Sequence, residues 1–246
     1  MKIILCGACG RMGKVVCEVV NEGFGGASIA AAVDITLPTL ACPCYTSLDQ
    51  IKEPADVLID FSHHSATDSI LSFALARKMP VVIATTGQTD EEKEKIKKAS
   101  QIIPVFFSGN MSIGIALLIS LAKKAASVFH DADVEIVETH HNRKLDVPSG
   151  TALMIADGIR EARGCGEFCI GRHENGKRPE GEIGIHSLRL GNVVGEHEIR
   201  INTGTQTITL KHEAHSRALF AEGALTAAAF LAEQKNGLFN VNDLFG

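Results

Sequence analysis

The chain has 246 residues, 45% of them hydrophobic and 22% charged, which is the composition of a folded globular protein with one large domain or two smaller ones. With no tryptophan, one tyrosine and a formal net charge of -5, it lacks the aromatic stacking surface and the positive charge that nucleic-acid binding requires. The apolar stretch at residues 1–6 is too short for a signal peptide or a membrane span, so we expect a cytoplasmic protein.

The N-terminal segment has the order strand, glycine loop and helix. Residues 2–6 are an apolar run, Gly7, Gly10 and Gly13 follow in the pattern Gly-x-x-Gly-x-x-Gly, and valines with helical spacing occupy residues 15–20. This order is typical of a dinucleotide-binding site, in which glycines let the backbone approach the pyrophosphate. Because the usual pattern is Gly-x-Gly-x-x-Gly, a tight turn without a ligand remains the alternative.

A second strand is predicted for residues 28–33 and is followed by Asp34, about 20 residues beyond the glycine loop, where an acidic side chain binds the ribose hydroxyls of NAD. The carboxylate would repel the 2′-phosphate of NADPH, and residues 35–37 offer no arginine to bind that phosphate. Arg11 in the glycine loop could still do so. We therefore expect NADH to be preferred and NADPH to be tolerated.

The alternation of strands and helices continues to residue 111. Three further strands and two helices are predicted, at residues 57–61, 81–84 and 102–106 and at residues 62–78 and 90–100. Ser62 is expected to cap the first of these helices. Repeated βα units predict an α/β fold with a doubly wound parallel sheet that binds ligands at the carboxyl ends of its strands. The loops expected beside the nicotinamide ribose contain Ala84, Thr85 and Thr86, and Ser108, Gly109, Asn110 and Met111.

The sequence changes character after Ser112. A long helix and four strands are predicted, at residues 113–128 and at residues 133–139, 182–189, 197–202 and 205–211. They indicate a second, α+β domain with a mixed, mostly antiparallel sheet, and residues 163–181 are interpreted as an exposed loop. A last helix at residues 216–234 is expected to pack on the first domain. The predicted domains are therefore 1–111, completed by 216–246, and 112–215.

The segment that links strand 133–139 to the next helix concentrates side chains that can be positively charged. His140, His141 and Lys144 precede Ser149-Gly150-Thr151, where the helix would begin and its backbone N–H groups point outward. This combination predicts an anion-binding site, and a carboxylate is the expected anion. Asp146 is interpreted as a structural acceptor that holds Lys144 or the backbone.

These motifs resemble those of the dihydrodipicolinate reductase family, and the resemblance covers nearly the whole chain. The longest and most specific match is Glu138-x-His140-His141-x-x-Lys144-x-Asp146-x-Pro148-Ser149-Gly150-Thr151-Ala152. Shorter matches are Gly7-x-x-Gly10-Arg11-Met12-Gly13, Asp60-Phe61-Ser62, Thr85-Thr86-Gly87 and Asn110-Met111-Ser112. Val147 stands where the family usually has alanine, and the segment between Asp34 and Val57 is short, but neither departure removes a chemical group.

The resemblance implies reduction of 4-hydroxy-tetrahydrodipicolinate to tetrahydrodipicolinate, with loss of water, by NADH or NADPH in lysine and diaminopimelate biosynthesis. His140 would be the acid or base near the ring and Lys144 the proton donor. His141, Gly150 and Thr151 would bind a substrate carboxylate. The second domain would bind substrate and build a homotetramer. The cofactor would contact the loops named above together with Gly7, Ala8, Cys9, Gly10, Arg11, Met12 and Asp34.

Three other classes of protein stay open. A non-catalytic nucleotide sensor would be expected to lack Lys144 and both histidines. A related NAD(P)-dependent amino-acid or oxo-acid oxidoreductase, such as aspartate dehydrogenase, would not be expected to carry the long motif. A metal-dependent lyase would need carboxylates near His140 that cannot be placed from the sequence. The seven cysteines form no complete four-ligand zinc pattern, so no metal site is predicted.

Overall fold

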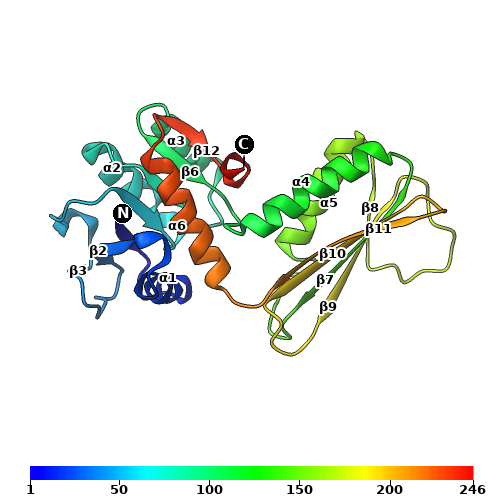
Figure 1. Cartoon of the computed structure of the whole chain (residues 1–246), viewed down its shortest axis with the longest axis horizontal. Helices are drawn as coiled ribbons and strands as arrows, with labels where there is room; N and C mark the ends of the chain where they lie inside the picture. Colours follow the sequence, from blue (N-terminus) through cyan, green and yellow to red (C-terminus); the bar gives the residue numbers. More distant parts are fainter. Residues whose placement is uncertain (246) are drawn as a thin grey trace. The chain divides into compact units, whose positions relative to one another are not determined.

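The computed structural model describes residues 1–245 and divides into two compact units. The first unit combines Met1–Ile113 with the segment that starts at Arg217, and the second is Gly114–Ser216. Each unit contains one sheet with its helices, as Figure 1 shows. None of the helices in the described residues is both long enough and apolar enough to cross a membrane.

The first unit is built on a seven-stranded sheet in the order β12-β6-β5-β4-β1-β2-β3. All of its pairings are parallel, which confirms the predicted doubly wound sheet. Its strands are β1 (Lys2–Cys6), β2 (Ser28–Val33), β3 (Cys44–Tyr45), β4 (Val57–Asp60), β5 (Val81–Ile83), β6 (Pro104–Phe107) and β12 (Gly237–Phe239). Its helices are α1 (Arg11–Asn21), α2 (Thr67–Arg77), α3 (Asp90–Ala99) and α6 (Ala218–Ala232), with short 3-10 turns η1 (Phe24–Gly26), η2 (Leu48–Gln50), η3 (His64–Ala66) and η4 (Val241–Leu244).

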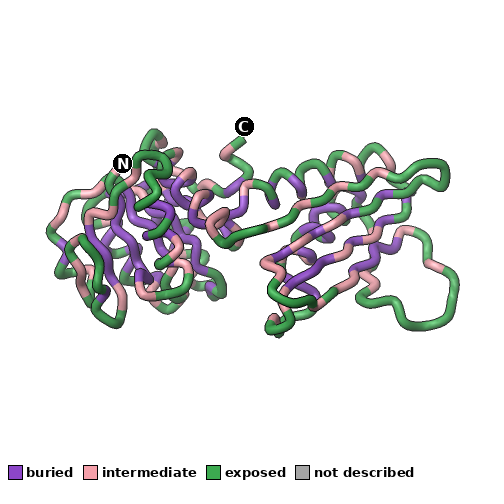
Figure 2. Tube along the Cα trace, turned by 60° about the horizontal axis from the view of Figure 1, so that its bottom comes forward, coloured by how far each residue is buried: buried purple, intermediate pink, exposed green. Residues whose placement is uncertain are grey.

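Both faces of this sheet are covered by helices, so its strands are apolar throughout rather than alternating. On one face, Ile4 and Leu58 pack with Ile70 of α2 and Ile96 of α3. The other face is covered by α6, which contacts β4, β5, β6 and α1. Figure 2 shows the central strands buried and many of the connecting loops exposed.

The strand order creates a switch point between β1 and β4. From β1 the chain continues outward through β2 and β3, and it then returns to the other side of β1 and continues through β4, β5 and β6. At such a point the loops after the two central strands diverge and leave a crevice at their carboxyl ends, where doubly wound sheets bind ligands. The glycine loop after β1 lies at this position.

The second unit has a five-stranded sheet in the order β11-β10-β7-β9-β8. Its elements are α4 (Ile113–Val128), β7 (Asp133–His140), α5 (Gly150–Arg163), β8 (Phe168–Ile170), β9 (Ile183–Arg189), β10 (Gly195–Asn202) and β11 (Thr207–Ala214). The sheet is mixed as predicted, although only the pairings of β10 with β7 and β11 are antiparallel. Both helices lie on one face of the sheet (Figure 1), and Ile155 and Ile159 of α5 pack there with Ile136 and Ile199.

Two local predictions were wrong. Ser62 does not cap a helix: its hydroxyl donates to Asp60 over 2.5 Å, and η3 precedes α2. The cap of η3 is His63 instead, whose side chain accepts from the Ser65 N–H, so the helical segment starts later than predicted. Residues 163–181 are not entirely an exposed loop, because β8 lies within them and pairs with the edge of β9. A strand this short leaves almost no pattern in the sequence.

Candidate active site

The glycine loop of the first unit is shaped by close backbone contacts. Gly7 has φ +77°, and a Cβ added there would lie 2.5 Å from the carbonyl oxygen of Phe61. A Cβ on Gly13 would lie 2.2 Å from the carbonyl oxygen of Gly7. Only glycine at position 7 permits the loop to touch the chain that follows β4. Only glycine at position 13 permits α1 to pack against the loop. Both glycines are therefore required by the crevice that the strand order creates.

A cavity of about 1010 Å³ opens beside this loop. Its lining includes Gly7, Cys9, Gly10 and Asp34 among the predicted cofactor residues. The Asp34 carboxylate accepts a hydrogen bond of 2.8 Å from the Cys9 backbone N–H, so the residue after β2 is tied directly to the loop. Cavities of this size hold cofactors, and the loop, the carboxylate and the switch point together fit a dinucleotide.

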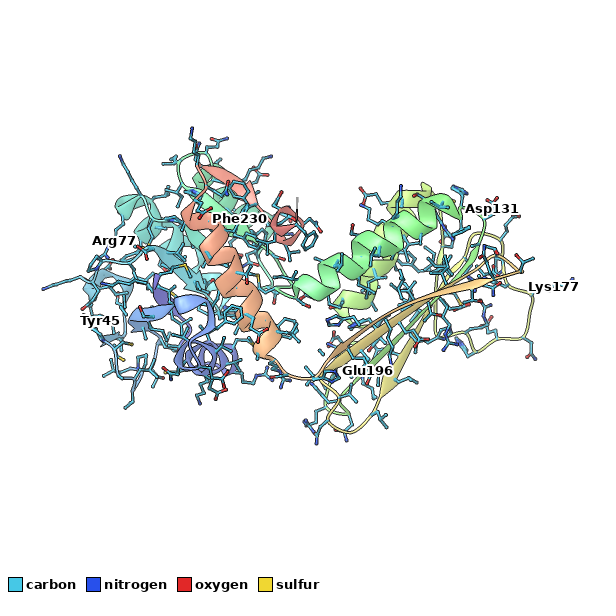
Figure 3. The ribbon with its side chains drawn as sticks, viewed as in Figure 1. Tyr45, Arg77, Asp131, Lys177, Glu196 and Phe230 are labelled. Carbon is cyan, nitrogen blue, oxygen red and sulfur yellow. The ribbon has the colours of Figure 1, made fainter. Side chains whose placement is uncertain are left out.

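The far wall of the cavity is braced by Arg77 at the end of α2. Its guanidinium donates to the carbonyl oxygens of Ile51 and Glu53 and lies 4.4 Å from the centre of the Phe73 ring. Tyr45 at the end of β3 donates to the Glu53 carboxylate over 2.8 Å. Figure 3 labels Tyr45 and Arg77 in this region. These bonds fix the segment between β3 and β4 although it has little regular structure.

The two predicted ribose-side loops lie next to one another but do not line this cavity. Thr85 donates to the buried Asp60 carboxylate over 2.8 Å, and burial raises the pKa of Asp60 although bonds from Ser62 and Thr85 oppose the rise. A Cβ on Gly109 would lie 3.8 Å from Thr86. The loops after β4, β5 and β6 thus share one end of the sheet. Of the residues predicted there, Ala84, Ser108 and Met111 are buried as well.

In the second unit, the helix-covered face of the sheet changes from apolar to polar at one end. Along β7, Val134 and Ile136 are followed on the same face by Glu138 and His140. The neighbouring strands change in the same way, because register pairs Glu138 with Ser187 and His197, and His140 with Arg189. The predicted histidine therefore lies in a polar cluster where the sheet meets the start of α5.

Glu138 is the centre of this cluster and is fully buried, with 0% of its surface exposed. It accepts from His140 Nδ1 over 2.5 Å, from the Ser149 backbone N–H over 3.1 Å and from both terminal nitrogens of Arg189 over 2.9 Å. Burial alone would raise the pKa of Glu138, but the bonds from His140 and Arg189 outweigh burial and hold that pKa well below its usual value. Glu138 is a carboxylate at any ordinary pH.

His197 lies beside the predicted pair. Its ring centre is 5.2 Å from that of His140, edge to face, and its Nε2 lies 3.1 Å from the hydroxyl of Ser149. Only 3% of His197 is exposed, and burial, assisted by the nearby charge of His140, lowers its pKa to about 3. His197 is therefore neutral, and it packs against His140 without adding charge to the cluster.

Lys144 lies in the loop after β7, with its Nζ 2.9 Å from Asp146 Oδ1. The bond from Lys144 lowers the pKa of Asp146. The Asp146 backbone oxygen in turn accepts from Arg189 over 2.8 Å, so Arg189 connects the loop to the polar cluster around Glu138. The sequence-based interpretation of Asp146 as a structural acceptor agrees with these contacts.

Helix α5 begins at Gly150, directly beside these groups. Ser149 is its N-cap, and its hydroxyl accepts from the Ala152 N–H over 3.1 Å. The first turn of α5 contains no acidic side chain, and the space around the Gly150 Cα has no heavy atom within 4 Å of an added Cβ. The positive end of the helix dipole therefore lies near His140, whose partner Glu138 also accepts from the Ser149 N–H, and the loop that carries His141 and Lys144 leads into it, so this place suits an anion.

The first unit has the parallel sheet and glycine loop of a nucleotide-binding domain, and the second has basic side chains that suit an anionic ligand. This combination is typical of an oxidoreductase that uses a nicotinamide nucleotide. Comparison with family models identifies it further: the model "Dihydrodipicolinate reductase, N-terminus" matches residues 1–111, and "Dihydrodipicolinate reductase, C-terminus" matches residues 114–245. The chain belongs to the dihydrodipicolinate reductase family, which uses NAD(P)H. This result confirms the resemblance and the enzyme class, and it does not favour the alternative amino-acid oxidoreductase.

Individual relatives agree with the family models. The 4-hydroxy-tetrahydrodipicolinate reductase of Caldanaerobacter subterraneus subsp. tengcongensis is 47% identical and covers 99% of this chain and 98% of its own. The enzyme of the same name from Clostridium novyi is 42% identical, with 99% and 97% covered. Among solved structures, a dipicolinate-bound dihydrodipicolinate reductase from Paenisporosarcina sp. TG-14 has a TM-score of 0.83 at 26% identity and covers 98% of this chain and 97% of its own.

Three members of the polar cluster around Glu138 were missing from the predicted site: Glu138 itself, Arg189 and His197. A signal for them exists in the sequence, because Glu138 and His140 are two residues apart in a strand and must share a face. The apolar stripe of each strand also ends in a polar residue on that face. What the sequence lacks is the register that places these three strands side by side.

Proposed function

We propose that the chain reduces 4-hydroxy-tetrahydrodipicolinate to tetrahydrodipicolinate, with loss of water, in lysine and diaminopimelate biosynthesis. The observation that carries the proposal is that the segment with His140, His141 and Lys144 leads into the N-terminus of α5 in a member of the reductase family. The Paenisporosarcina relative is described as bound to dipicolinate, a ring with two carboxylates, and this supports a dicarboxylate as the ligand of such a site.

The carboxylate-binding role falls to His141, Gly150 and Thr151. The start of α5 offers backbone N–H groups and the positive dipole end, and the open space at Gly150 lets a carboxylate approach the backbone. A dianion at this position would compete with Asp146 for Lys144, since that carboxylate is 59% exposed and weakly held. Lys144 would then move from Asp146 to the substrate.

The proton chemistry falls to His140 and Lys144. When bound, the reduced nicotinamide supplies a hydride, and the substrate ring then accumulates negative charge that nearby cations stabilise. Lys144 is the proposed proton donor, because its side chain is partly exposed and lies in the loop before α5. His140 is the proposed acid or base beside the ring, held in place by Glu138.

The cofactor residues proposed in the first unit are those of the glycine loop, Asp34 and the loops after β5 and β6. NADH is the proposed preferred cofactor and NADPH a tolerated one. Asp34 supports this preference, because the bond from Cys9 N–H holds its carboxylate at the loop, where it would repel a 2′-phosphate. Arg11 is exposed in the same loop and supports tolerance of that phosphate.

The homotetramer and the cytoplasmic location stay predictions. The homotetramer has support in the second unit, because both helices cover the same face of the five-stranded sheet (Figure 1). The helices leave the other face, to which Glu135, Glu198 and Arg200 belong, open to another subunit. Sedimentation of the purified chain at several concentrations tests the assembly. A single species of monomer mass at micromolar concentration contradicts it.

A coupled assay tests the reaction. Pyruvate and aspartate semialdehyde are supplied with the synthase that condenses them, and the absorbance of NADH is followed after this chain is added. The proposal expects oxidation that requires all four components. Absence of turnover, or equal turnover when the synthase is omitted, contradicts it.

A further inference from the structure

We propose that Glu138 is a positioning residue that fixes the tautomer of the His140 imidazole, so that Nδ1 carries the hydrogen and Nε2 exchanges protons with the substrate. The role of Nε2 toward the substrate rests on the proposed function. The tautomer is a property of the folded chain alone, so it is measurable without turnover.

The geometry leaves Glu138 only the acceptor role. Its two oxygens receive four donors, of which the Ser149 N–H and the two Arg189 nitrogens have no alternative to donating. Arg189 also brings a full positive charge into contact with a carboxylate that is itself 0% exposed. The charge of Arg189 and the bonds donated to Glu138 hold its pKa well below the usual value, and an ionised carboxylate has no hydrogen to donate. The 2.5 Å contact with His140 must therefore be a bond that Nδ1–H donates.

The opposite edge of the His140 ring is held by backbone. A Cβ added to Gly195 in β10 would lie 3.0 Å from Nε2 and 3.4 Å from Cδ2 of His140. Figure 3 labels the next residue, Glu196, in the same strand. Glycine at this position leaves room for Nε2, while the edge of His197 supports the ring from the side. The ring is thus fixed in orientation as well as in tautomer.

Replacement of Glu138 by glutamine distinguishes this role from a purely structural one. The oxygen of the introduced amide would take the place of Oε1, which accepts from both Ser149 N–H and Arg189. The amide nitrogen would then take the place of Oε2, lose the bond from Arg189 Nη1 and donate toward His140 Nδ1. A donor at that position requires Nδ1 to accept, so the hydrogen of the neutral ring moves to Nε2. An Asp-to-Asn change beside the histidine of a serine protease has this effect on the tautomer.

The measurement is a long-range ¹H–¹⁵N correlation spectrum of the full chain labelled with ¹⁵N-histidine, at a pH where the imidazoles are neutral. His140→Asn identifies the signals of His140 by their loss. The wild type is expected to show Nδ1–H with an unprotonated Nε2, and Glu138→Gln the reverse. An Nε2–H tautomer in the wild type overturns the proposal without any variant, as does an unchanged tautomer in folded Glu138→Gln.

Two further variants guard against misfolding. Glu138→Asp keeps a carboxylate, so the Nδ1–H tautomer is expected to persist even if Glu138→Gln does not fold; its inversion in Glu138→Asp contradicts the proposal. Gly195→Ala displaces the Nε2 edge without changing the partner of Nδ1, so this variant is expected to lose turnover with the tautomer unchanged. Turnover by Glu138→Gln is expected to fall about 100-fold at little change in KM. If the wild type shows Nδ1–H but no reductase activity, the proposed function fails and the tautomer assignment stands.

Discussion

Lys144 and Asp146 form an ion pair within the loop that leads from β7 to α5, with 2.9 Å between Nζ and Oδ1. The pair holds a proposed proton donor at the anion site before substrate arrives. Because Asp146 is 59% exposed, the pair is worth at most about 1 kcal/mol and a dianion can displace it. Asp146 therefore keeps the Lys144 ammonium close to the proposed substrate site.

Asp146→Asn is expected to lower the KM for the substrate about two- to fivefold, since the dianion no longer competes with a carboxylate for Lys144. Steady-state kinetics at saturating cofactor measure this change. Asp157→Asn is the matched control, because Asp157 pairs with Arg160 on the exposed side of α5. A KM that rises tenfold in Asp146→Asn would show that Asp146 binds substrate or orders the loop.

Lys144→Ala is expected to lower kcat by about two orders of magnitude, the usual contribution of a general acid. Lys144→Arg separates charge from proton donation, because arginine keeps the positive charge but does not release a proton. Its kcat is expected to stay low while its KM stays near normal. Lys123→Ala, which removes a surface pair with Glu161 in the same unit, is the control. Near-normal turnover in Lys144→Ala removes Lys144 from the chemistry.

Asp34→Asn is expected to shift the ratio of kcat/KM values at least about tenfold toward NADPH, because the amide keeps an acceptor for the Cys9 N–H but loses the charge. Separate kinetics with NADH and NADPH give the ratio. Asp56→Asn provides the control, since Asp56 accepts from the Lys2 N–H at the opposite end of β1. An unchanged ratio would mean that Asp34 does not select the cofactor.

His197 is expected to make the second unit sensitive to acid. Its pKa is about 3 when folded and near the ordinary 6.5 when unfolded, so the unfolded chain binds the proton first as pH falls. Stability from this group is complete above pH 6.5 and is lost toward pH 3, at about 1.4 kcal/mol per pH unit. Thermal unfolding followed by circular dichroism between pH 6.5 and 5 measures the slope.

His197→Gln is expected to flatten this pH dependence, and the window above pH 5 separates the effect from protonation of Glu138, whose pKa lies lower still. His173→Gln, at an exposed histidine bonded to the Gly171 carbonyl, should leave the slope unchanged. Equal slopes in wild type and His197→Gln would contradict a neutral, buried His197.

The sequence predicted regular structure best where local signals coincide. The strand at Ser28–Val33 and the helix at Ile113–Val128 have the predicted bounds, because the first is an apolar run that ends at Asp34 and the second is a long, mostly apolar segment that begins after Ser112. The predicted start of α2 was wrong because whether Ser62 caps a helix or bonds to Asp60 depends on the burial of Asp60 in the folded chain. No local pattern contains that information.

The candidate site divides in the same way. His140, His141, Lys144 and Gly150 lie within eleven residues, from the end of β7 to the start of α5, so the sequence alone suggests that they are neighbours. Arg189 and His197 reach the site only through the register of β9 and β10 with β7. Side-chain alternation fixes the face of each strand, but the alignment between strands depends on core packing.

The second unit is inserted in the sequence of the first, so the last strand and the last helix of the first unit come at the end of the chain. Its edge strand β12 and the helix α6 that covers β4, β5 and β6 follow Arg217, whereas the second sheet has all its strands by Ala214. During synthesis the inserted unit is thus complete while the nucleotide unit still exposes one bare flank and the hydrogen-bonding groups of β6. Until α6 emerges from the ribosome, that surface stays exposed, and an unpaired strand edge beside apolar surface is prone to aggregation.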